Sequence, residues 1–459
     1  MARKSFSKPE IWGGLECSFN RVKDLYMDQL HYCGHYQRID ADIERIASLN
    51  IKALRYPIIW ERLHPHPGHA INWSTVDAAL SALQKYPIMP IAGLVHHGSG
   101  PRHADVLSPS FITGLSDFAG KVARRFPWLE YYTPVNEPLT TARFGGLYGL
   151  WFPHRRSDRA FAQAFVNEMK AVVMAMRQIR KINPHAKLVQ TEDLAKIYST
   201  PHLKYQADFE NHRRWLTCDF LCGMVDNDHP MWDYFIGAGI TEDSLKFLMD
   251  NPCPPDIVGL DYYATSERYL DEDIQKYPPH THGGNHFENY ADVEAFRVRH
   301  GQPSGIQVLL KECWDRYKLP MAITEVHIHC DIENQIRWFA EIRKACADMT
   351  QCGVDIKGVT AWALLGAFGW NDLLTKAHGD YEPGVFDLRP GAPVPTQMAE
   401  YLIALSNDPE YVHPAESQDG WWRREDRFIF ESPQPLQPLQ TSLEGEAPAN
   451  EGRGESRAA

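Results

Sequence analysis

Apolar positions along this chain follow two alternating patterns, short apolar runs and longer stretches with apolar residues three or four apart. Ile39, Ile43 and Ile46 have the longer spacing, which is typical of a helix with one buried stripe. The run Ile88–Val95 (IMPIAGLV) is short and almost entirely apolar, which predicts a strand. The alternation of strand and helix continues from about residue 11 to residue 405.

About eight strand–helix units are predicted, and the first strand is the faintest. The predicted strands are Ile11–Leu15, Lys52–Pro57, Ile88–Val95, Tyr131–Val135, Lys187–Thr191, Ile257–Tyr263, Met321–Thr324 and Gly358–Leu364. The predicted helices cover the segment around Ile39–Ala47, then Val76–Leu83, Phe111–Arg125, Phe161–Lys181, Leu203–Val225, Gly305–Tyr317, Asn334–Met349 and Pro395–Leu405. Such alternation indicates parallel strands joined by helices, an α/β fold. Eight units in ~400 residues favour a single-domain (β/α)8 TIM barrel with extended βα loops over an open sheet, although element order alone does not prove closure.

Composition divides the chain into three parts. Residues 1–412 form the predicted barrel, and Leu270–Gln302, rich in Asp, His, Pro and Gly, is predicted to be a long loop on its active-site face. Residues 413–430 contain Trp421, Trp422 and Phe428, which are apolar enough to dock on the barrel. Residues 431–459 are rich in Pro, Gln, Glu and Gly, which predicts a disordered acidic tail.

Charge and composition limit the classes of partner. The net charge is −12, which argues against nucleic acid as a partner, and no basic run for an anionic membrane is present. The 13 Trp, 20 Tyr and 20 Phe residues suit a large core, or platforms on which sugar rings stack. No run of ~18 apolar residues could span a membrane.

The N-terminal residues and the cysteines point to the cytoplasm. Arg3 and Lys4 are not followed by the apolar segment of a secretory signal. The nine cysteines are an odd number spread from Cys17 to Cys352, which we interpret as reduced thiols. We therefore expect a cytoplasmic protein.

Two glutamates stand at the ends of predicted strands, where the active sites of such barrels lie. Glu137 follows the fourth strand and precedes Pro138, and Glu325 ends the seventh. In a closed barrel these strands face each other across the mouth. Two facing carboxyls are what glycoside hydrolysis requires, and their separation, ~5–5.5 Å or roughly 6.5–9.5 Å, decides between retention and inversion. Ordinary salt bridges at the rim are the alternative explanation for both residues.

An ordered series of motifs from about Ile11 to Leu405 resembles glycoside hydrolase family 1, the β-glucosidase and 6-phospho-β-glycosidase family, in a divergent branch. The matching segments are His35–Arg38 (HYQR), Leu54–Pro65 (LRYPIIWERLHP), Val95–His97 (VHH), Thr133–Pro138 (TPVNEP), Gly259–Tyr263 (GLDYY), Ile323–Glu325 (ITE) and Trp362–Trp370 (WALLGAFGW). These resemble H-Y-x-R, R-F-S-I-x-W-x-R-I-x-P, Y-H-W, T-F-N-E-P, G-I-N-Y-Y, I-T-E-N-G and W-S-L-L-D-N-F-E-W of the family.

The resemblance implies a role for each matching residue. Glu137 would be the acid/base and Glu325 the nucleophile of a retaining double displacement. Asn136 would hydrogen-bond the sugar 2-hydroxyl, a contact that strengthens in the transition state. Arg55 and Tyr263 would lie beside Glu325 and keep it ionised.

Other residues correspond to the shell that reads the sugar. His96 would contact a ring hydroxyl, Trp362 would lie under the sugar, and Trp370 ends the same motif. Asn20 falls near the family's N-terminal Gln, which reads the 3- and 4-hydroxyls. Gly369 stands where the family has the Glu that grips the 4- and 6-hydroxyls.

Further departures surround that glycine. Gly366-Ala367 replaces D-N, Asp261 replaces Asn, Val326-His327 replaces N-G, and His97 replaces Trp. The hydrolytic centre therefore matches the family while the hydroxyl-reading shell differs. We expect a plain glucoside such as cellobiose not to be the natural substrate, since a site that leaves hydroxyls of the substrate unpaired discriminates against that substrate.

No cofactor or metal is predicted. His327, His329 and Cys330 resemble part of a zinc site, but their spacing fixes no third ligand and equally suits contacts with a sugar. Gly13-Gly14 and Gly283-Gly284 lack the spacing of a dinucleotide or phosphate loop. Glu192 and Asp193 follow the fifth strand and could replace the lost hydroxyl contacts, or they could cap the next helix or pair with Arg or Lys.

The sequence thus predicts a retaining O-glycosyl hydrolase of carbohydrate metabolism with a small carbohydrate or glycoside as its partner. Two alternatives remain open. The missing hydroxyl-reading residues suit a non-catalytic sugar-binding barrel linked to sugar-nucleotide or polysaccharide metabolism. A transglycosylase would pass the same covalent intermediate to a sugar acceptor. The sugar, the aglycone and the oligomeric state are not determined by the sequence.

Overall fold

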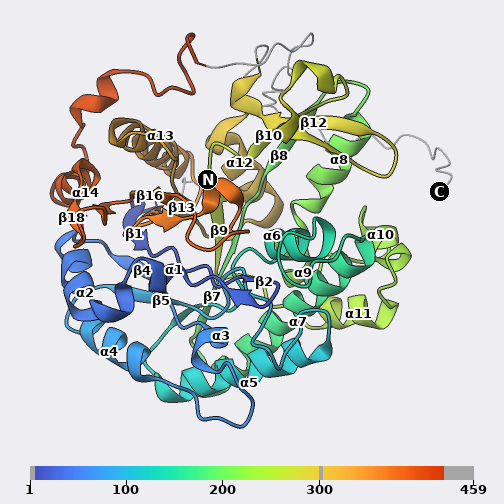
Figure 1. The fold of residues 1–459 in the computed structure, drawn as a ribbon, viewed down its shortest axis with the longest axis horizontal. Helices are drawn as coiled ribbons and strands as arrows, with labels where there is room; N and C mark the ends of the chain where they lie inside the picture. The colour runs from blue at the N-terminus through green and yellow to red at the C-terminus, as the bar shows by residue number, and fades with distance from the viewer. Residues whose placement is uncertain (1–5, 299–302, 428–459) are drawn as a thin grey trace.

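The computed structural model describes residues 6–298 and 303–427, which form a closed barrel of eight parallel strands (Figure 1). The strands are β1 (Glu10–Gly14), β4 (Ala53–Pro57), β5 (Met89–Gly93), β6 (Tyr131–Thr133), β7 (Lys187–Glu192), β9 (Ile257–Tyr262), β13 (Met321–Val326) and β14 (Ile356–Ala361). The barrel closes because β1 pairs with both β4 and β14. The predicted fold class is confirmed, and each barrel strand overlaps its predicted range.

Helices surround the barrel (Figure 1), and apolar residues of each helix belong to the buried core. They are α2 (Ile39–Ser48), α4 (Ser74–Leu83), α5 (Pro109–Arg125), α7 (Asp158–Ile182), α12 (Gly305–Tyr317), α13 (Ile332–Gln351) and α14 (Gln397–Asn407). Local sequence sets their ends. Ser108 accepts a hydrogen bond from the Ser110 backbone N–H and precedes Pro109, so α5 begins with a capped, proline-containing first turn.

The barrel interior is filled by side chains and is not a pore. Six buried residues, each from a different strand, form one inner cluster: Trp12, Ala53, Ile91, Val189, Ile257 and Ala322. This apolar filling leaves the carboxyl ends of the strands as the place where polar side chains gather.

Two predictions of local structure were wrong. Segment 203–225 is not one helix, because α8 (Lys204–Arg213) ends before α9 (Leu216–Leu221) begins. The segment 270–302 is not only a loop. It contributes to a four-stranded sheet of β8 (Lys196–Ser199), β10 (Glu267–Asp271), β12 (Asn289–Glu294) and β11 (His282–Gly284). In that sheet β8 pairs in parallel with β10, far along the chain, so no local pattern reveals it.

The remaining elements are short and lie mostly in the βα loops. The helices are α1 (Gln29–Tyr32), α3 (Trp60–Leu63), α6 (Pro138–Ala142), η2 (Arg143–Leu147), α10 (Trp232–Gly237) and α11 (Glu242–Asp250), together with the single turns η1 (His35–Gln37), η3 (Ile274–Lys276), η4 (Pro279–Thr281), η5 (Ala295–Arg297), η6 (Trp370–Asp372) and η7 (Pro414–Ser417). The strands are β2 (Arg21–Val22), β3 (Leu25–Tyr26), β15 (Ala367–Phe368), β16 (Tyr381–Glu382), β17 (Phe386–Asp387) and β18 (Val394–Pro395). In the described residues no helix is both long and apolar enough to cross a membrane.

The segment after α14 contacts α13. Trp422 is fully buried, its ring meets that of Trp338 at 4.9 Å and 90°, and its indole N–H donates to Glu341. We propose that residues 413–430 are a docked extension of the barrel domain of residues 1–412. Phe428 and the predicted tail 431–459 lie outside the described residues.

Candidate active site

Glu137 lies four residues beyond the end of β6 and directly before α6. Its backbone has φ 41°, an unusual left-handed conformation for a residue other than glycine. The first turn of α6 is capped by Glu192 instead, which accepts from the Leu139 backbone N–H at 2.9 Å. The Glu137 carboxyl is buried and free to face the barrel mouth. Glu192 therefore contacts a helix that precedes its own strand, not the next helix, and burial raises its pKa while Arg143 offsets part of that rise.

Glu325 lies near the end of β13 and is held by two donors. Arg55 on β4 donates to one carboxylate oxygen at 2.7 Å, and the Tyr263 hydroxyl donates to the other. The pairing of β13 with β9 shifts register between Ile323 and Glu325. Such an irregularity re-aims side chains at the end of a strand.

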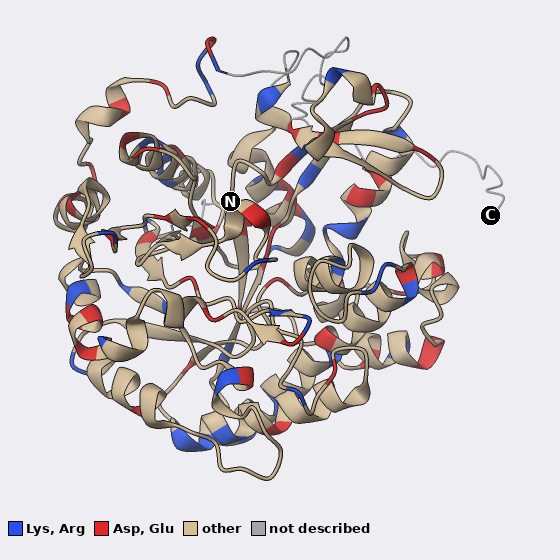
Figure 2. Cartoon of the chain, viewed as in Figure 1, with Lys and Arg blue, Asp and Glu red and all other residues tan. Residues whose placement is uncertain are grey.

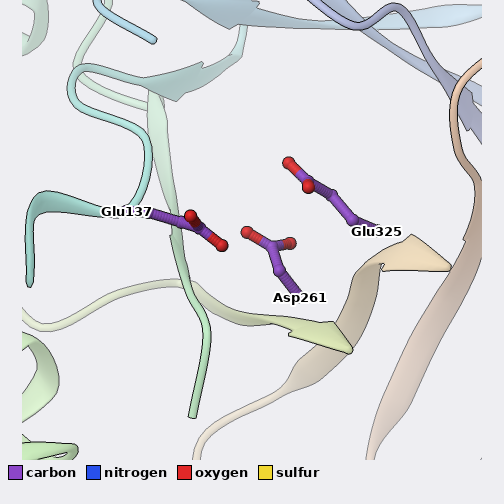
Figure 3. Close-up of side chains that lie close together, drawn as sticks. All are labelled: Glu137, Asp261 and Glu325. Carbon is purple, nitrogen blue, oxygen red and sulfur yellow. The ribbon is translucent and has the colours of Figure 1, made fainter. Parts of the chain in front are cut away.

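Asp261 on β9 is a third carboxylate between these two (Figure 3). One carboxylate oxygen from each of Glu137, Asp261 and Glu325 lies within 4.8 Å of the others. The Thr324 hydroxyl donates to Asp261 Oδ1 at 2.6 Å, whereas the buried Oδ2 has no hydrogen-bond partner among the described residues. The approach of Glu137 and Glu325 fits the close spacing of retaining enzymes, not the wide spacing of inverting ones.

The charged groups around the two glutamates differ, and this difference affects which carboxyl holds a proton. Burial raises the pKa of Glu137, and Asp261 and Glu325 raise it further. Burial and Asp261 also raise the pKa of Glu325 well above its ordinary value, although Arg55 and the Tyr263 hydroxyl offset part of that rise. Arg55 lies 2.7 Å from Glu325, so it favours ionisation of Glu325 over ionisation of Glu137, and an acid and a nucleophile need a preference in this direction.

His97 does not change this assignment. Its Nε2 lies 3.7 Å from Glu137, but burial lowers the pKa of His97 to about 3. The imidazole is therefore neutral at ordinary pH and supplies no positive charge to Glu137.

Asn136 is fixed by three partners. Its side-chain oxygen accepts from Arg55 and from the Thr191 hydroxyl, and its amide donates to His96 Nε2 at 3.2 Å. Because His96 Nε2 accepts here, its proton lies on Nδ1, which faces the Cys17 sulfur at 3.3 Å. Asn136 and His96 are thus brought together with Arg55 in one buried network.

Trp362 and Trp370 form a wall beside this network. Trp362 stacks on His96 with ring centroids 5.8 Å apart, and the Arg55 guanidinium carbon lies over the Trp362 ring, 4.6 Å from its centroid. A Cβ atom on Gly14 would come within 2.4 Å of the Trp362 ring, so the glycine allows the close approach.

Glu16 is a site residue that sequence reasoning missed. It is buried, and its Oε2 accepts from the indole N–H groups of Trp362 at 3.3 Å and Trp370 at 3.1 Å. Ser18 donates to the other oxygen through its hydroxyl and backbone N–H. Glu16 lies two residues beyond β1, so the strand-end criterion that selected Glu137 and Glu325 could have found it.

Asn20 lies farther along the same segment. Its amide donates to the Leu374 backbone oxygen at 3.1 Å, and its buried side-chain oxygen has no partner among the described residues. Gly369 has φ 74°, a conformation that suits glycine, and it has no side chain that could place a carboxylate here. His327 and His329 both face Glu382, at 3.3 and 3.4 Å.

The sequence and its fold were compared with known proteins. The model of glycosyl hydrolase family 1 matches residues 16–381. The chain belongs to this family. It is therefore a glycoside hydrolase of the retaining type, and the alternative of a non-catalytic sugar-binding barrel is not favoured.

Individual relatives are distant. Aryl-phospho-beta-D-glucosidase BglC of Bacillus subtilis is 21% identical over 390 residues, covering 75% of this chain and 80% of the relative. Beta-glucosidase A of Thermotoga maritima is 23% identical over 381 residues, covering 76% and 81%. A solved structure of the Thermotoga maritima beta-glucosidase with deoxynojirimycin matches with a TM-score of 0.70 at 18% identity, over 89% of this chain and all of that one.

Proposed function

We propose that this glycoside hydrolase cleaves a β-glycoside with Glu325 as nucleophile and Glu137 as acid/base. The observation that carries the proposal is the asymmetry around the two carboxyls. Glu325 receives hydrogen bonds from Arg55 and Tyr263, while the charged groups that face Glu137 in the described residues are carboxylates and its neighbour His97 is neutral. A carboxylate and a carboxylic acid then face each other at a retaining distance.

In the first step Glu325 attacks the anomeric carbon, and the bonding pair leaves with the aglycone oxygen. Glu137 gives its proton to that oxygen, so the alcohol departs neutral. In the second step Glu137, now ionised, takes a proton from water while the water oxygen attacks the anomeric carbon and releases Glu325. Asn136 is held rigidly by Arg55 and Thr191, which supports its role at the sugar 2-hydroxyl.

The sugar-reading shell supports a substrate other than a plain glucoside. Gly369 offers no side chain to a sugar hydroxyl, and the polar groups near the tryptophans come from Glu16 instead. Two relatives are named for glucosides and for aryl phospho-glucosides. We propose that His96, Trp362, Trp370 and Asn20 line the pocket of the cleaved sugar.

The cell compartment and the partners are part of the proposal. All nine cysteines are free and most are buried, which supports a reducing compartment such as the cytoplasm. The net charge of −12 and the mixture of acidic and basic residues along the outer helices in Figure 2 support a small carbohydrate, not nucleic acid, as the partner.

Glu137→Gln tests the acid role through the leaving group. Rates should be measured on aryl and alkyl glycosides of one sugar whose leaving groups differ in acidity. We expect a loss of about 10²–10⁴-fold on an alkyl glycoside and a much smaller loss of the first step on a dinitrophenyl glycoside, which needs little acid help. An equal loss on both substrates would contradict the assignment.

A further inference from the structure

The buried carboxyl of Asp261 has no task in the mechanism above. It lies within 4.8 Å of Glu137 and Glu325, it is 1% exposed, and its Oδ2 lacks a partner among the described residues. A buried carboxylate oxygen without a donor is costly, by about 1–3 kcal/mol or more. The arrangement therefore needs a proton or a cation beside Oδ2.

We propose that Asp261 and Glu137 hold one proton between them in the free enzyme, so that Asp261 positions the acid/base and sets the pH at which it ionises. The inference rests on the proposed role of Glu137. A hydrogen bond between the two carboxyls satisfies Asp261 Oδ2 without any further group. Figure 3 shows the Asp261 carboxyl pointing into the gap between Glu137 and Glu325.

The other contacts of Asp261 favour this pairing. Thr324 donates to Oδ1 at 2.6 Å, and Arg55 lies 3.8 Å from the same oxygen, which leaves only Oδ2 for Glu137. Arg55 is closer to Glu325, at 2.7 Å, so its charge acts mainly on the nucleophile. A cation bound by all three carboxylates would instead tie up both the acid and the nucleophile.

Charged and titratable groups face Glu137 from each element packed around it. They are His97 after β5, Glu192 and Asp193 at the end of β7, Asp261 and Tyr263 at the end of β9, and Glu325 on β13. Arg143 lowers the pKa of both Glu192 and Asp193, which partly offsets the influence of those two acids. Asp261 contributes most among the neighbouring charges that raise the pKa of Glu137.

The charge of Asp261 should affect the rates of the two catalytic steps in opposite directions. A negative neighbour makes Glu137 a weaker acid in the first step. The same neighbour makes the ionised Glu137 a stronger base in the second step, when Glu325 is esterified and carries no charge. Removing the charge of Asp261 should slow the second step relative to the first.

The test is Asp261→Asn, measured by the pH profile of kcat/KM and by infrared titration of protonated carboxyls. The amide keeps the size of the side chain and removes its charge, so we expect the basic limb of the profile to move down by about one pH unit or more. Subtracting the infrared titration of the Glu137→Gln form isolates the signal of the Glu137 carboxyl, both in the unaltered protein and in Asp261→Asn. The midpoint of that signal should also lie at lower pH in Asp261→Asn. The infrared titration needs no substrate, so it separates this proposal from the choice of glycoside.

Thr324→Val is a second variant that acts in the opposite direction. It removes the hydroxyl that stabilises ionised Asp261, so the pair should hold its proton to higher pH and the basic limb should rise. Glu168→Gln is the matched control, because Glu168 is also a fully buried glutamate but lies on α7 and is not among the groups facing Glu137. It should leave the basic limb in place.

Unchanged basic limbs and unchanged Glu137 titrations in folded Asp261→Asn and Thr324→Val proteins would overturn the proposal. Loss of the protonated-carboxyl signal at neutral pH on adding Mg²⁺, with recovery in EDTA, would overturn it in favour of a cation site. Persistence of that signal in both conditions would support the shared proton.

Discussion

The strand-end centre and the loop-built wall beside it differ in how their polar groups are held. In the centre, Arg55 and Glu325 lie on barrel strands, Asn136 lies three residues beyond β6, and Arg55 bonds to both of the others. In the wall, Trp362 and Trp370 come from the segment after β14 and are bridged by Glu16 from the segment after β1. The rigid strands carry the chemistry, and the loops are where a different sugar can be accommodated.

Glu325→Gln should have the largest effect and should fall on the centre alone. The amide keeps the size of the side chain but cannot form the glycosyl ester, so we expect kcat to fall by about 10⁴-fold or more. Steady-state hydrolysis of an aryl glycoside measures the loss, and circular dichroism checks that the variant is folded. Substantial activity in the folded variant would remove the distinction between centre and wall.

Tyr263→Phe should have a smaller effect with a characteristic pH dependence. The hydroxyl donates to Glu325 and lowers its pKa, so without it the pKa of the nucleophile should rise. We expect the acidic limb of kcat/KM to move to higher pH, with a rate loss of roughly tenfold. Tyr262→Phe is the control, because the Tyr262 hydroxyl donates to Glu267 at 2.8 Å instead. Equal shifts in both variants would contradict the assignment.

Glu16→Gln should disturb the wall while sparing the centre. A glutamine has one acceptor oxygen, so it cannot accept from both the Ser18 donors and the two indole N–H groups. We expect KM to rise by roughly tenfold with a smaller change in kcat, as each lost hydrogen bond is worth about 1 kcal/mol.

Glu10→Gln is the matched control for that variant. Glu10 also accepts from an indole N–H, that of Trp12 at 3.0 Å, but it stands at the opposite end of β1. Its kinetics should equal those of the unaltered protein. A fall in kcat without any change in KM for Glu16→Gln would place Glu16 in the centre. The centre and the wall would then have no separate roles.

Glu168→Gln should change only stability. Both carboxyl oxygens of Glu168 are buried without partners among the described residues, and burial raises its pKa well above 4.5. The native state then binds more protons than the unfolded state once pH exceeds the ordinary value, so stability should fall as pH rises, by up to ~1.4 kcal/mol per unit. Urea unfolding at pH 5 and pH 8 should show a smaller fall in Glu168→Gln than in the unaltered protein, since other buried carboxyls such as Glu61 and Glu192 contribute to the fall in both. Parallel behaviour of the two proteins would mean that Glu168 is ionised in the fold.

The sequence predicted the barrel because hydrophobic periodicity is local. Strands such as β5 and helices such as α7 bury regular faces, and their apolar spacing is visible within a dozen residues. The β8–β10 pairing joins segments about seventy residues apart, and no short window contains that information. The break between α8 and α9 carries no glycine or proline, so the sequence offered no stop signal.

The sequence predicted those site residues whose place depends only on where a barrel strand ends. Glu137 and Glu325 follow from the rule that barrel chemistry lies at strand ends. The partners of Glu16 and the free oxygen of Asp261 depend on side-chain distances across the barrel mouth, which residue order does not set. Asp261 was noticed only as a departure from the family pattern, and its closeness to Glu137 came from the structure.

The most direct test of the account is intact-protein mass spectrometry after incubation with 2-deoxy-2-fluoro glycosides that carry good leaving groups. The panel should include gluco, galacto, manno, fuco and 6-phospho sugars. We expect a mass gain of one sugar, located on Glu325 by peptide mapping, retained in Glu10→Gln and absent in Glu325→Gln. An adduct that persists in Glu325→Gln, or one located on another residue, would contradict the assignment of the nucleophile.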